Sequence, residues 1–267
     1  MEVIEASGGD VDEDGLLEPI GRGVQADVFG TGRWVVKVRR FSMLGTLAKL
    51  ISSKHWKQEV HDGLGGLVAP FLLLDEVAFR APKMRGRGGR VIEYRDRGAV
   101  VRERYPTDQF LDHRLSLAEP ADALALVEEM VVLVERVRAR GFCMIDFCMS
   151  NFAVIDGRLM IVDADLIAPI RSLWEPGLRT CAAGFARGLS KDYQRLLGEL
   201  GDEVEDDANL SDEIASLSEA LPKRIGRLRK RSLPGLETEP AVPVEFDADL
   251  AAEIRAALCP PSPGLKK

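Results

Sequence analysis

The sequence predicts a bilobal α+β protein with an antiparallel β-sheet in the N-terminal lobe and a mainly helical C-terminal lobe. Two observations carry this prediction. Short β-rich runs separated by glycine turns fill the chain up to residue 105, whereas segments with a helical apolar period dominate after Pro106. A hairpin signal at Asp156-Gly157 then interrupts the helical half. Strands followed by helices, rather than alternating with them, indicate segregated α and β layers.

The composition fits a globular chain without a membrane span. Its 267 residues are 46% apolar and 30% charged, and no apolar run reaches the roughly eighteen residues that a span requires. We expect a cytoplasmic location, because the acidic N-terminus lacks the basic start and apolar stretch of a secretory signal. The net charge of −7 argues against nucleic acid as a partner, since such binding depends on Lys and Arg that neutralise phosphates.

Composition also divides the chain into four expected parts. Residues 1–16 are rich in Gly, Asp and Glu and are predicted to form a flexible acidic leader. The N-lobe is expected over residues 17–105 and the helical C-lobe over 106–232. Pro-rich stretches in residues 233–267 form a tail around one short amphipathic helix, Ala248 to Leu258.

The N-lobe is predicted to begin with a β-hairpin. A strand-like segment from Glu18 to Phe29 contains two glycines, and Gly30-Thr31-Gly32 then turns the chain into the β-rich run 33–38. A helical period follows over Leu44 to Leu64. The remaining strands are expected at Leu67 to Phe79 and Gly98 to Tyr105.

The C-lobe is predicted to open with a long helix from about Glu119 to Arg140, which has one apolar face and is ended by Gly141. Two short apolar runs follow, joined by Asp156-Gly157, the strongest hairpin signal in the chain. These runs are Phe152 to Ile155 and Leu159 to Val162, and further helices are expected at Ser190 to Leu200 and Leu210 to Leu221.

The first hairpin contains a turn that backbone amides could use to approach a phosphate. Gly21 and Gly23 leave no side chain in the way, although an ordinary hairpin is the commoner meaning of such a motif alone. Lys37 follows between valines, where a lysine needs an anionic partner unless it points to solvent. Glu59 is the natural partner for Lys37, and Glu76 is a less favoured alternative.

The strongest chemical signal is a set of three oxygen-bearing side chains around the C-lobe hairpin. Asp146 is followed five positions later by Asn151, which enters one strand, and Asp163 ends the other strand. Such oxygen ligands suit Mg²⁺, which proteins hold with one or two groups plus substrate phosphates. Each residue alone could cap a turn or end a strand. Together with the upstream glycine turn and lysine, they favour a nucleotide-phosphate and metal site.

Over roughly Glu18 to Leu200, these motifs resemble the protein-kinase-like superfamily, which spans protein kinases and small-molecule and lipopolysaccharide kinases. The chain resembles divergent bacterial-type small kinases more than regulated protein kinases. The resemblance implies a bilobal protein-kinase-like fold. It also implies ATP- and Mg²⁺-dependent phosphate transfer to a hydroxyl of a small-molecule, saccharide or protein acceptor.

The resemblance also implies a role for each matched residue. Asp146 would be the catalytic base that accepts the proton of the acceptor hydroxyl, and Asn151 and Asp163 would hold Mg²⁺. Lys37 would contact the ATP phosphates and pair with Glu59. The full set implied for nucleotide binding is Gly21, Gly23, Val28, Lys37 and Glu59.

The catalytic segment departs from the protein-kinase pattern at three places. Met144-Ile145 stands where His-Arg is usual, so an activation-loop phosphate has no arginine to anchor it and a protein Ser/Thr kinase is disfavoured. Ala164-Asp165 replaces Phe-Gly, and an acidic residue there is common in small-molecule and sugar kinases. Cys148 replaces the lysine that neutralises γ-phosphate charge. This loss favours the alternative function, a pseudokinase that binds nucleotide or regulates without efficient turnover.

A basic, Gly-rich turn lies between the two later strands and carries Arg85, Arg87 and Arg90. Two interpretations stay open. The turn could dock an anionic acceptor such as a phosphorylated saccharide or a lipid headgroup, or it could be a solvated hairpin.

The cysteines and histidines predict no further site. The four cysteines are unevenly spread and include no zinc-like pair, so neither a disulfide framework nor a zinc site is expected. Cys143 and Cys148 flank the catalytic segment, where buried packing is favoured over a reactive role.

Overall fold

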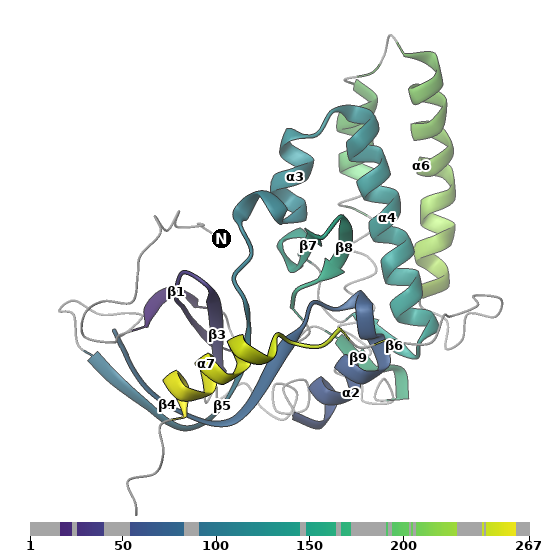
Figure 1. Cartoon of the computed structure of the whole chain (residues 1–267). Coiled ribbons are helices and arrows are strands. Elements are labelled where there is room, and N and C mark those ends of the chain that lie inside the picture. The colour runs from purple at the N-terminus through teal and green to yellow at the C-terminus, as the bar shows by residue number, and fades with distance from the viewer. Residues whose placement is uncertain are drawn as a thin grey trace, which may run out of the picture. The chain divides into compact units, whose positions relative to one another are not determined.

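The chain forms two compact units in the computed structural model, drawn together in Figure 1. The first comprises Met1–Ala48, Pro70–Arg104 and Val244–Lys267, and the second Lys49–Ala69 and Tyr105–Pro243. The structure describes residues 17–22, 26–39, 54–82, 91–144, 148–163, 167–171, 191, 194–202, 204, 207–228, 242 and 244–259.

The first unit is built on a five-stranded antiparallel sheet in the order β1-β2-β3-β5-β4. The backbone N–H of Leu17, just before β1, donates to the carbonyl of Arg80 in β4 at 3.3 Å, so the sheet curls and its two edge strands meet (Figure 1). Curling of this kind protects strand edges that would otherwise be open to pairing. The strands are β1 (Glu18–Arg22), β2 (Ala26–Gly30), β3 (Trp34–Arg39), β4 (Phe71–Pro82) and β5 (Val91–Glu103).

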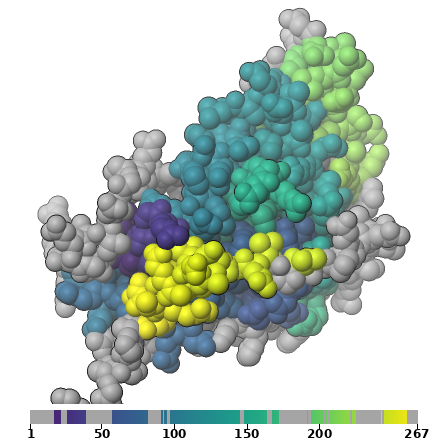
Figure 2. Space-filling view, viewed as in Figure 1, coloured from purple at the N-terminus to yellow at the C-terminus, as the bar shows by residue number. Residues whose placement is uncertain are grey.

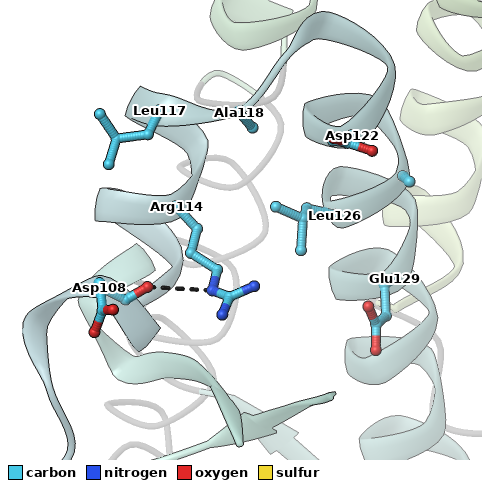
Figure 3. A pocket seen from close by; sticks show the side chains of 8 residues that line it. Asp108, Arg114, Leu117, Ala118, Asp122, Leu126 and Glu129 are labelled. Carbon is cyan, nitrogen blue, oxygen red and sulfur yellow. Dashed lines mark hydrogen bonds between the residues drawn. The ribbon is translucent and has the colours of Figure 1, made fainter.

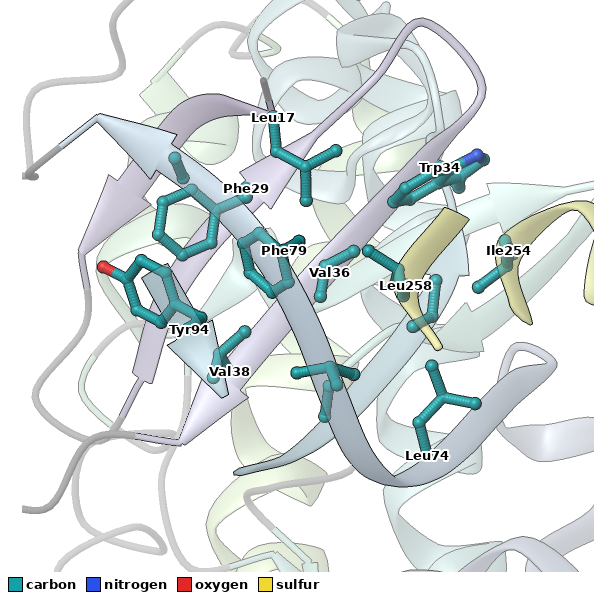
Figure 4. Packing of buried hydrophobic residues seen from close by; sticks show 14 of the residues in the cluster. Leu17, Phe29, Trp34, Val36, Val38, Leu74, Phe79, Tyr94, Ile254 and Leu258 are labelled. Atoms are coloured by element: carbon teal, nitrogen blue, oxygen red, sulfur yellow. The ribbon is translucent and has the colours of Figure 1, made fainter. Parts of the chain in front are cut away.

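One face of this sheet carries the hydrophobic core of the first unit (Figure 4). Trp34, Val36 and Val38 alternate along β3 and point to this face, because successive side chains of a strand point to opposite sides. Phe29 joins them from β2, with its ring 4.9 Å from that of Tyr94 in edge-to-face contact. Residues between these positions, including the lysine of β3, therefore lie on the other face.

Helix α7 (Ala248–Leu258) covers the core face. Its buried residues Leu250, Ile254 and Leu258 recur every four positions and form one apolar stripe. Asp247 caps the helix by accepting a hydrogen bond from the N–H of Leu250 at 2.6 Å. The outer side of α7, yellow in Figure 2, stays at the surface of the molecule.

The second unit is mainly helical and contains two small two-stranded sheets, β6-β9 and β7-β8. The side chain of Arg224 in α6 donates to both carboxylate oxygens of Glu135 in α4, at 3.0 and 2.8 Å, and so joins the two longest helices (Figure 1). Within the described residues of this unit, the helices with three or more turns are α2 (Lys54–Leu64), α4 (Pro120–Ala139) and α6 (Ala208–Leu228), accompanied by the shorter α3 (Leu111–Leu117) and a helical stretch at 194–202. The strands are β6 (Phe142–Met144), β7 (Phe152–Ile155), β8 (Arg158–Ile161) and β9 (Ile167–Pro169).

These two units confirm the predicted α+β class, with an antiparallel N-terminal sheet and a mainly helical C-terminal part. The long helix, the hairpin at Asp156-Gly157 and the helix Ala248–Leu258 are found where they were expected. None of the helices within the described ranges is both long and apolar enough to cross a membrane. The leader 1–16 and residues 44–53 of the expected first helix lie outside the described residues.

Several boundaries differ from the expectation. Strands β4 and β5 reach Pro82 and begin at Val91, so they extend further toward the basic turn than predicted. Helix α6 continues through Pro222 to Leu228 instead of ending at Leu221. A proline inside a helix costs a backbone hydrogen bond. The two hydrogen bonds from Arg224 to α4 hold the continued helix in place.

Two elements also group differently from the expected division of the chain. Helix α2 belongs to the second unit. Gly63 makes this packing possible, because a Cβ there would lie 2.6 Å from the ring of Phe142 in β6. Helix α7, expected in a separate tail, belongs to the first unit and completes its core.

Candidate functional site

Lys37 lies on the sheet face opposite the core, in a row of apolar neighbours. In the strand register Lys37 is paired with Val28 of β2 and Val100 of β5, and Val100 is paired with Leu73 of β4. Directly paired residues of antiparallel strands share a face. All four residues are only half-buried. This face therefore offers an apolar strip with one ammonium group.

Gly21 lies in β1 at an irregularity of the β1–β2 register, between Pro19 and Gly21. A Cβ built at Gly21 would have no atom within 4 Å, so tight packing does not require glycine there. A bulge favours glycine, and so does the close approach of a ligand to the backbone. Gly23, predicted to act with Gly21, lies outside the described residues.

The β7–β8 hairpin brings two of the predicted site residues to one end. Asn151 immediately precedes β7, and Asp163 follows β8 by two positions. The carbonyl of Asn151 accepts a hydrogen bond from the N–H of Val162 at 2.8 Å, which fixes the two chain segments side by side. Both Asn151 and Asp163 are half-buried. A carboxylate and an amide oxygen therefore lie at the same open end of the hairpin.

The opposite end of the hairpin closes through the predicted turn. Asp156 and Gly157 both have positive φ, 49° and 73°. Two consecutive positive φ angles are typical of a type I′ turn, whose twist matches that of the paired strands. The turn thereby sets the register Phe152↔Ile161, which in turn sets the positions of Asn151 and Val162.

Neighbouring segments hold both edges of the hairpin. The N–H of Ala69 donates to the carbonyl of Ile161 at 2.8 Å on the β8 side. Phe110 forms an antiparallel bridge with Ala153 on the β7 side. Because both edges are paired, the end that carries Asn151 and Asp163 has a rigid base.

Asp146, the predicted catalytic base, lies outside the described residues, two positions after the end of β6. Met144, the last residue of β6, is paired with Ile167, the first residue of β9. The segment that leads to Asp146 therefore leaves β6 at the same end of this small sheet at which the segment from Asp163 enters β9. The distance from Asp146 to the other site residues stays a prediction.

Glu59 of α2 forms an ion pair that the sequence did not indicate. Both terminal nitrogens of Arg171, just after β9, donate to the two carboxylate oxygens of Glu59. The hydrogen bonds and the charge of Glu59 raise the pKa of Arg171. No motif in the sequence pointed to Arg171. The predicted pair of Lys37 with Glu59, and the alternative with Glu76, remain predictions.

Cys143 in β6 is buried, as expected, and its thiol donates to the carbonyl of Ala168 at 3.4 Å. Burial raises its pKa to about 11, although the nearby Arg138 and the hydrogen bond to Ala168 act in the opposite direction. A thiol with such a pKa is protonated at neutral pH and is a poor nucleophile. Cys148, by contrast, is exposed, with its sulfur 2.7 Å from the hydroxyl of Ser150.

The turn residues Arg85, Arg87 and Arg90 lie outside the described residues. Within the described ranges, no three His, Cys, Asp or Glu side chains gather as they would around a metal ion. This is compatible with Mg²⁺, which often takes only one or two protein ligands.

No protein family and no curated protein matches the sequence. Among solved structures, 669 chains match. One of them is a divergent kinase that lacks the glycine-rich loop and regulates membrane ultrastructure of the Toxoplasma parasitophorous vacuole. It is 18% identical, with 76% of this chain and 70% of that chain covered and a TM-score of 0.45.

Proposed function

We propose that the chain has a protein-kinase-like fold and acts as an ATP- and Mg²⁺-dependent phosphotransferase on a hydroxyl of a small-molecule, saccharide or protein acceptor. The observation that carries the proposal is the β7–β8 hairpin. Asn151 and Asp163 stand at its one open end, held together by the hydrogen bond from Val162 to Asn151. Asp146 precedes Asn151 by five positions, the spacing of a catalytic base and a metal ligand in kinases.

The donor set fits a magnesium ion. Asn151 and Asp163 would be its ligands through an amide oxygen and a carboxylate oxygen, which are hard donors. Both side chains are half-buried, so they are neither sealed from a ligand nor free to move widely. When bound, the ion would neutralise phosphate charge that builds up during transfer.

The face of the sheet opposite the hydrophobic core fits the nucleotide. Val28 and Val100 flank Lys37 in register and offer apolar area for a base beside a cation for phosphates. Gly21, whose Cβ position is empty, would allow backbone amides to approach those phosphates. Asp146 would accept the proton of the acceptor hydroxyl, and Arg85, Arg87 and Arg90 would attract an acceptor that is anionic.

Two observations favour the alternative of a pseudokinase. Cys148 stands at the position of the lysine that neutralises the γ-phosphate in protein kinases. Glu59, the predicted partner of Lys37, is paired with Arg171. In this alternative, nucleotide binds without efficient transfer.

A thermal-shift assay with ATP, with and without Mg²⁺, tests the proposal beside an ADP-release assay over sugar and peptide acceptors. Asp163→Ala should lose the Mg²⁺-dependent shift, whereas Asp146→Ala should keep it and lose ADP release. Asp212→Ala, an exposed carboxylate on α6, is the matched control and should behave like the wild type.

The outcomes separate the two candidate functions. A nucleotide-dependent shift without ADP release from any acceptor supports the pseudokinase. If Asp163→Ala and Asp146→Ala both match the wild type in the two assays, the proposed site is wrong.

A further inference from the structure

A groove of about 450 Å³ lies between α3 and α4 in the second unit (Figure 3). Arg114 of α3 extends toward α4, where Leu126 and Glu129 face it. None of the residues proposed for phosphotransfer lines the groove. The lining consists of Asp108, Arg114, Leu117, Ala118, Asp122, Ala125, Leu126 and Glu129.

Negative charge dominates the groove. Three carboxylates line it against one guanidinium, and Arg114 is the only Lys or Arg in residues 107–129. The Nε of Arg114 donates to the backbone carbonyl of Asp108 at 3.2 Å. Because this hydrogen bond goes to the backbone, it does not neutralise the negative charge of the Asp108 carboxylate. Within the part of the chain that the structure describes, neither Asp108 nor Asp122 forms an ion pair. The groove therefore attracts cations.

Apolar groups lie between these charges. Leu126 is half-buried and faces the groove, with the small side chains of Ala118 and Ala125 beside it. Leu117, at the end of α3, has 72% of its surface exposed, more than any other large apolar residue in the described ranges. A ligand that complements this surface combines positive charge with an apolar group.

We propose that this groove docks a linear basic peptide segment of a partner protein, with Arg or Lys side chains next to an apolar side chain. The inference is independent of phosphate transfer and goes beyond it. The carboxylates and Arg114 are exposed, so a small cation would remain largely solvated, whereas small-molecule pockets enclose most of their ligand. The stretch Asp122 to Glu129 rises about 10 Å along α4, which an extended peptide of about three residues spans.

Fluorescence anisotropy with the full chain tests this proposal. The probe is a labelled ten-residue peptide with two arginines, two leucines and no acidic residue, compared with the same peptide carrying glutamates in place of the arginines. We expect the arginine peptide to bind and the glutamate peptide not to bind. Raising NaCl from about 50 to 300 mM should weaken the binding, because salt screens exposed charges.

Two charge-matched double variants locate the binding site. Asp108→Asn with Asp122→Asn should raise the Kd of the arginine peptide about fivefold or more, since two exposed charge pairs are lost. Asp212→Asn with Glu213→Gln removes two exposed carboxylates from α6 and should leave the Kd unchanged. Equal circular dichroism spectra and melting temperatures show that both variants are folded.

Three results would overturn the docking proposal. The first is no binding of the arginine peptide to the wild type. The second is an equal loss of affinity in the α3–α4 variant and the α6 variant. The third is competition by spermidine at the same concentration as unlabelled arginine peptide, which would assign the groove to small cations.

Discussion

Lys37 is the side chain that would hold the phosphates of the proposed nucleotide. The strand register places Lys37 between Val28 and Val100. The position of Lys37 is therefore determined by the sheet and not by a flexible loop. Lys37→Met keeps the length of the side chain and removes the charge. We expect this variant to bind ATP about tenfold or more weakly in equilibrium titration, because a charge-assisted contact to phosphate is lost.

The control for Lys37→Met is Lys191→Met, which removes an exposed lysine from the other unit. This control should bind ATP as the wild type does. Equal ATP affinity of Lys37→Met and the wild type would remove Lys37 from the nucleotide site.

Cys143 predicts a specific dependence of stability on pH. Its pKa is about 11 in the folded chain against an ordinary 9.0. The folded state thus holds the proton more tightly than the unfolded state does, and stability falls as the pH rises from about 9 to about 11. The full loss is roughly 3 kcal/mol by linkage, at about 1.4 kcal/mol for each pKa unit.

Urea unfolding at pH 8 and pH 10.5 measures this effect. The wild type should lose more unfolding free energy over this interval than Cys143→Ala, which lacks the titrating thiol. Equal losses would show that burial of Cys143 does not shift its titration. At pH 7.5 a maleimide should also modify the exposed Cys148 well before Cys143.

Among the structural elements, the β7–β8 hairpin shows most clearly what local sequence determines. Asp156-Gly157 predicted both the turn and the pairing of the two strands, because few other residue pairs accept two positive φ angles. The position of Asn151 beside Val162 follows from that register. The bonds on the hairpin edges, from Ala69 and Phe110, were not predictable, since they come from segments distant in sequence.

Gly157→Ala tests the turn. The φ of 73° places this residue in the left-handed region, where a Cβ costs about 1–2 kcal/mol. Guanidinium unfolding should show a loss of about this size, whereas Asp156→Gly should be tolerated because glycine adopts a positive φ readily. A Gly157→Ala variant as stable as the wild type would contradict the observed turn.

Helix α2 shows where local sequence was insufficient. Its helical period and terminal glycines were visible, but its assignment to one unit depends on tertiary packing. Gly63 lies against the ring of Phe142, a residue of the β6 strand far along the chain. The pairing of Glu59 with Arg171 is a consequence of the same packing and could not be seen in a local pattern.

For the whole molecule, the C-terminal helix changes the expected division of the chain. Residues 248–258 were predicted as a helix of a tail, yet Leu250, Ile254 and Leu258 belong to the core of the N-terminal sheet. An apolar stripe predicts that a helix packs against something, but it does not identify the surface. The sequence of the strands likewise did not predict that a helix near the C-terminal end of the chain would pack against the core face of the sheet.

Ile254→Ala tests this contribution of α7. Ile254 is fully buried in the core, so the substitution should cost about 2–4 kcal/mol of unfolding free energy through lost burial and a residual cavity. Arg255→Ala, an exposed neighbour on the same helix, should cost far less. Similar losses in the two variants, measured by urea unfolding, would mean that α7 does not complete the core of the first unit.

The central claim is that the hairpin end with Asn151 and Asp163 binds nucleotide through Mg²⁺. Calorimetric titration of ATP with and without Mg²⁺ into the wild type and Asp163→Asn tests it most directly, because the substitution removes the carboxylate charge and nearly preserves the shape. We predict that Mg²⁺ tightens ATP binding at least tenfold in the wild type and has little effect in Asp163→Asn. Equal tightening by Mg²⁺ in both proteins, or none in the wild type, would contradict the claim.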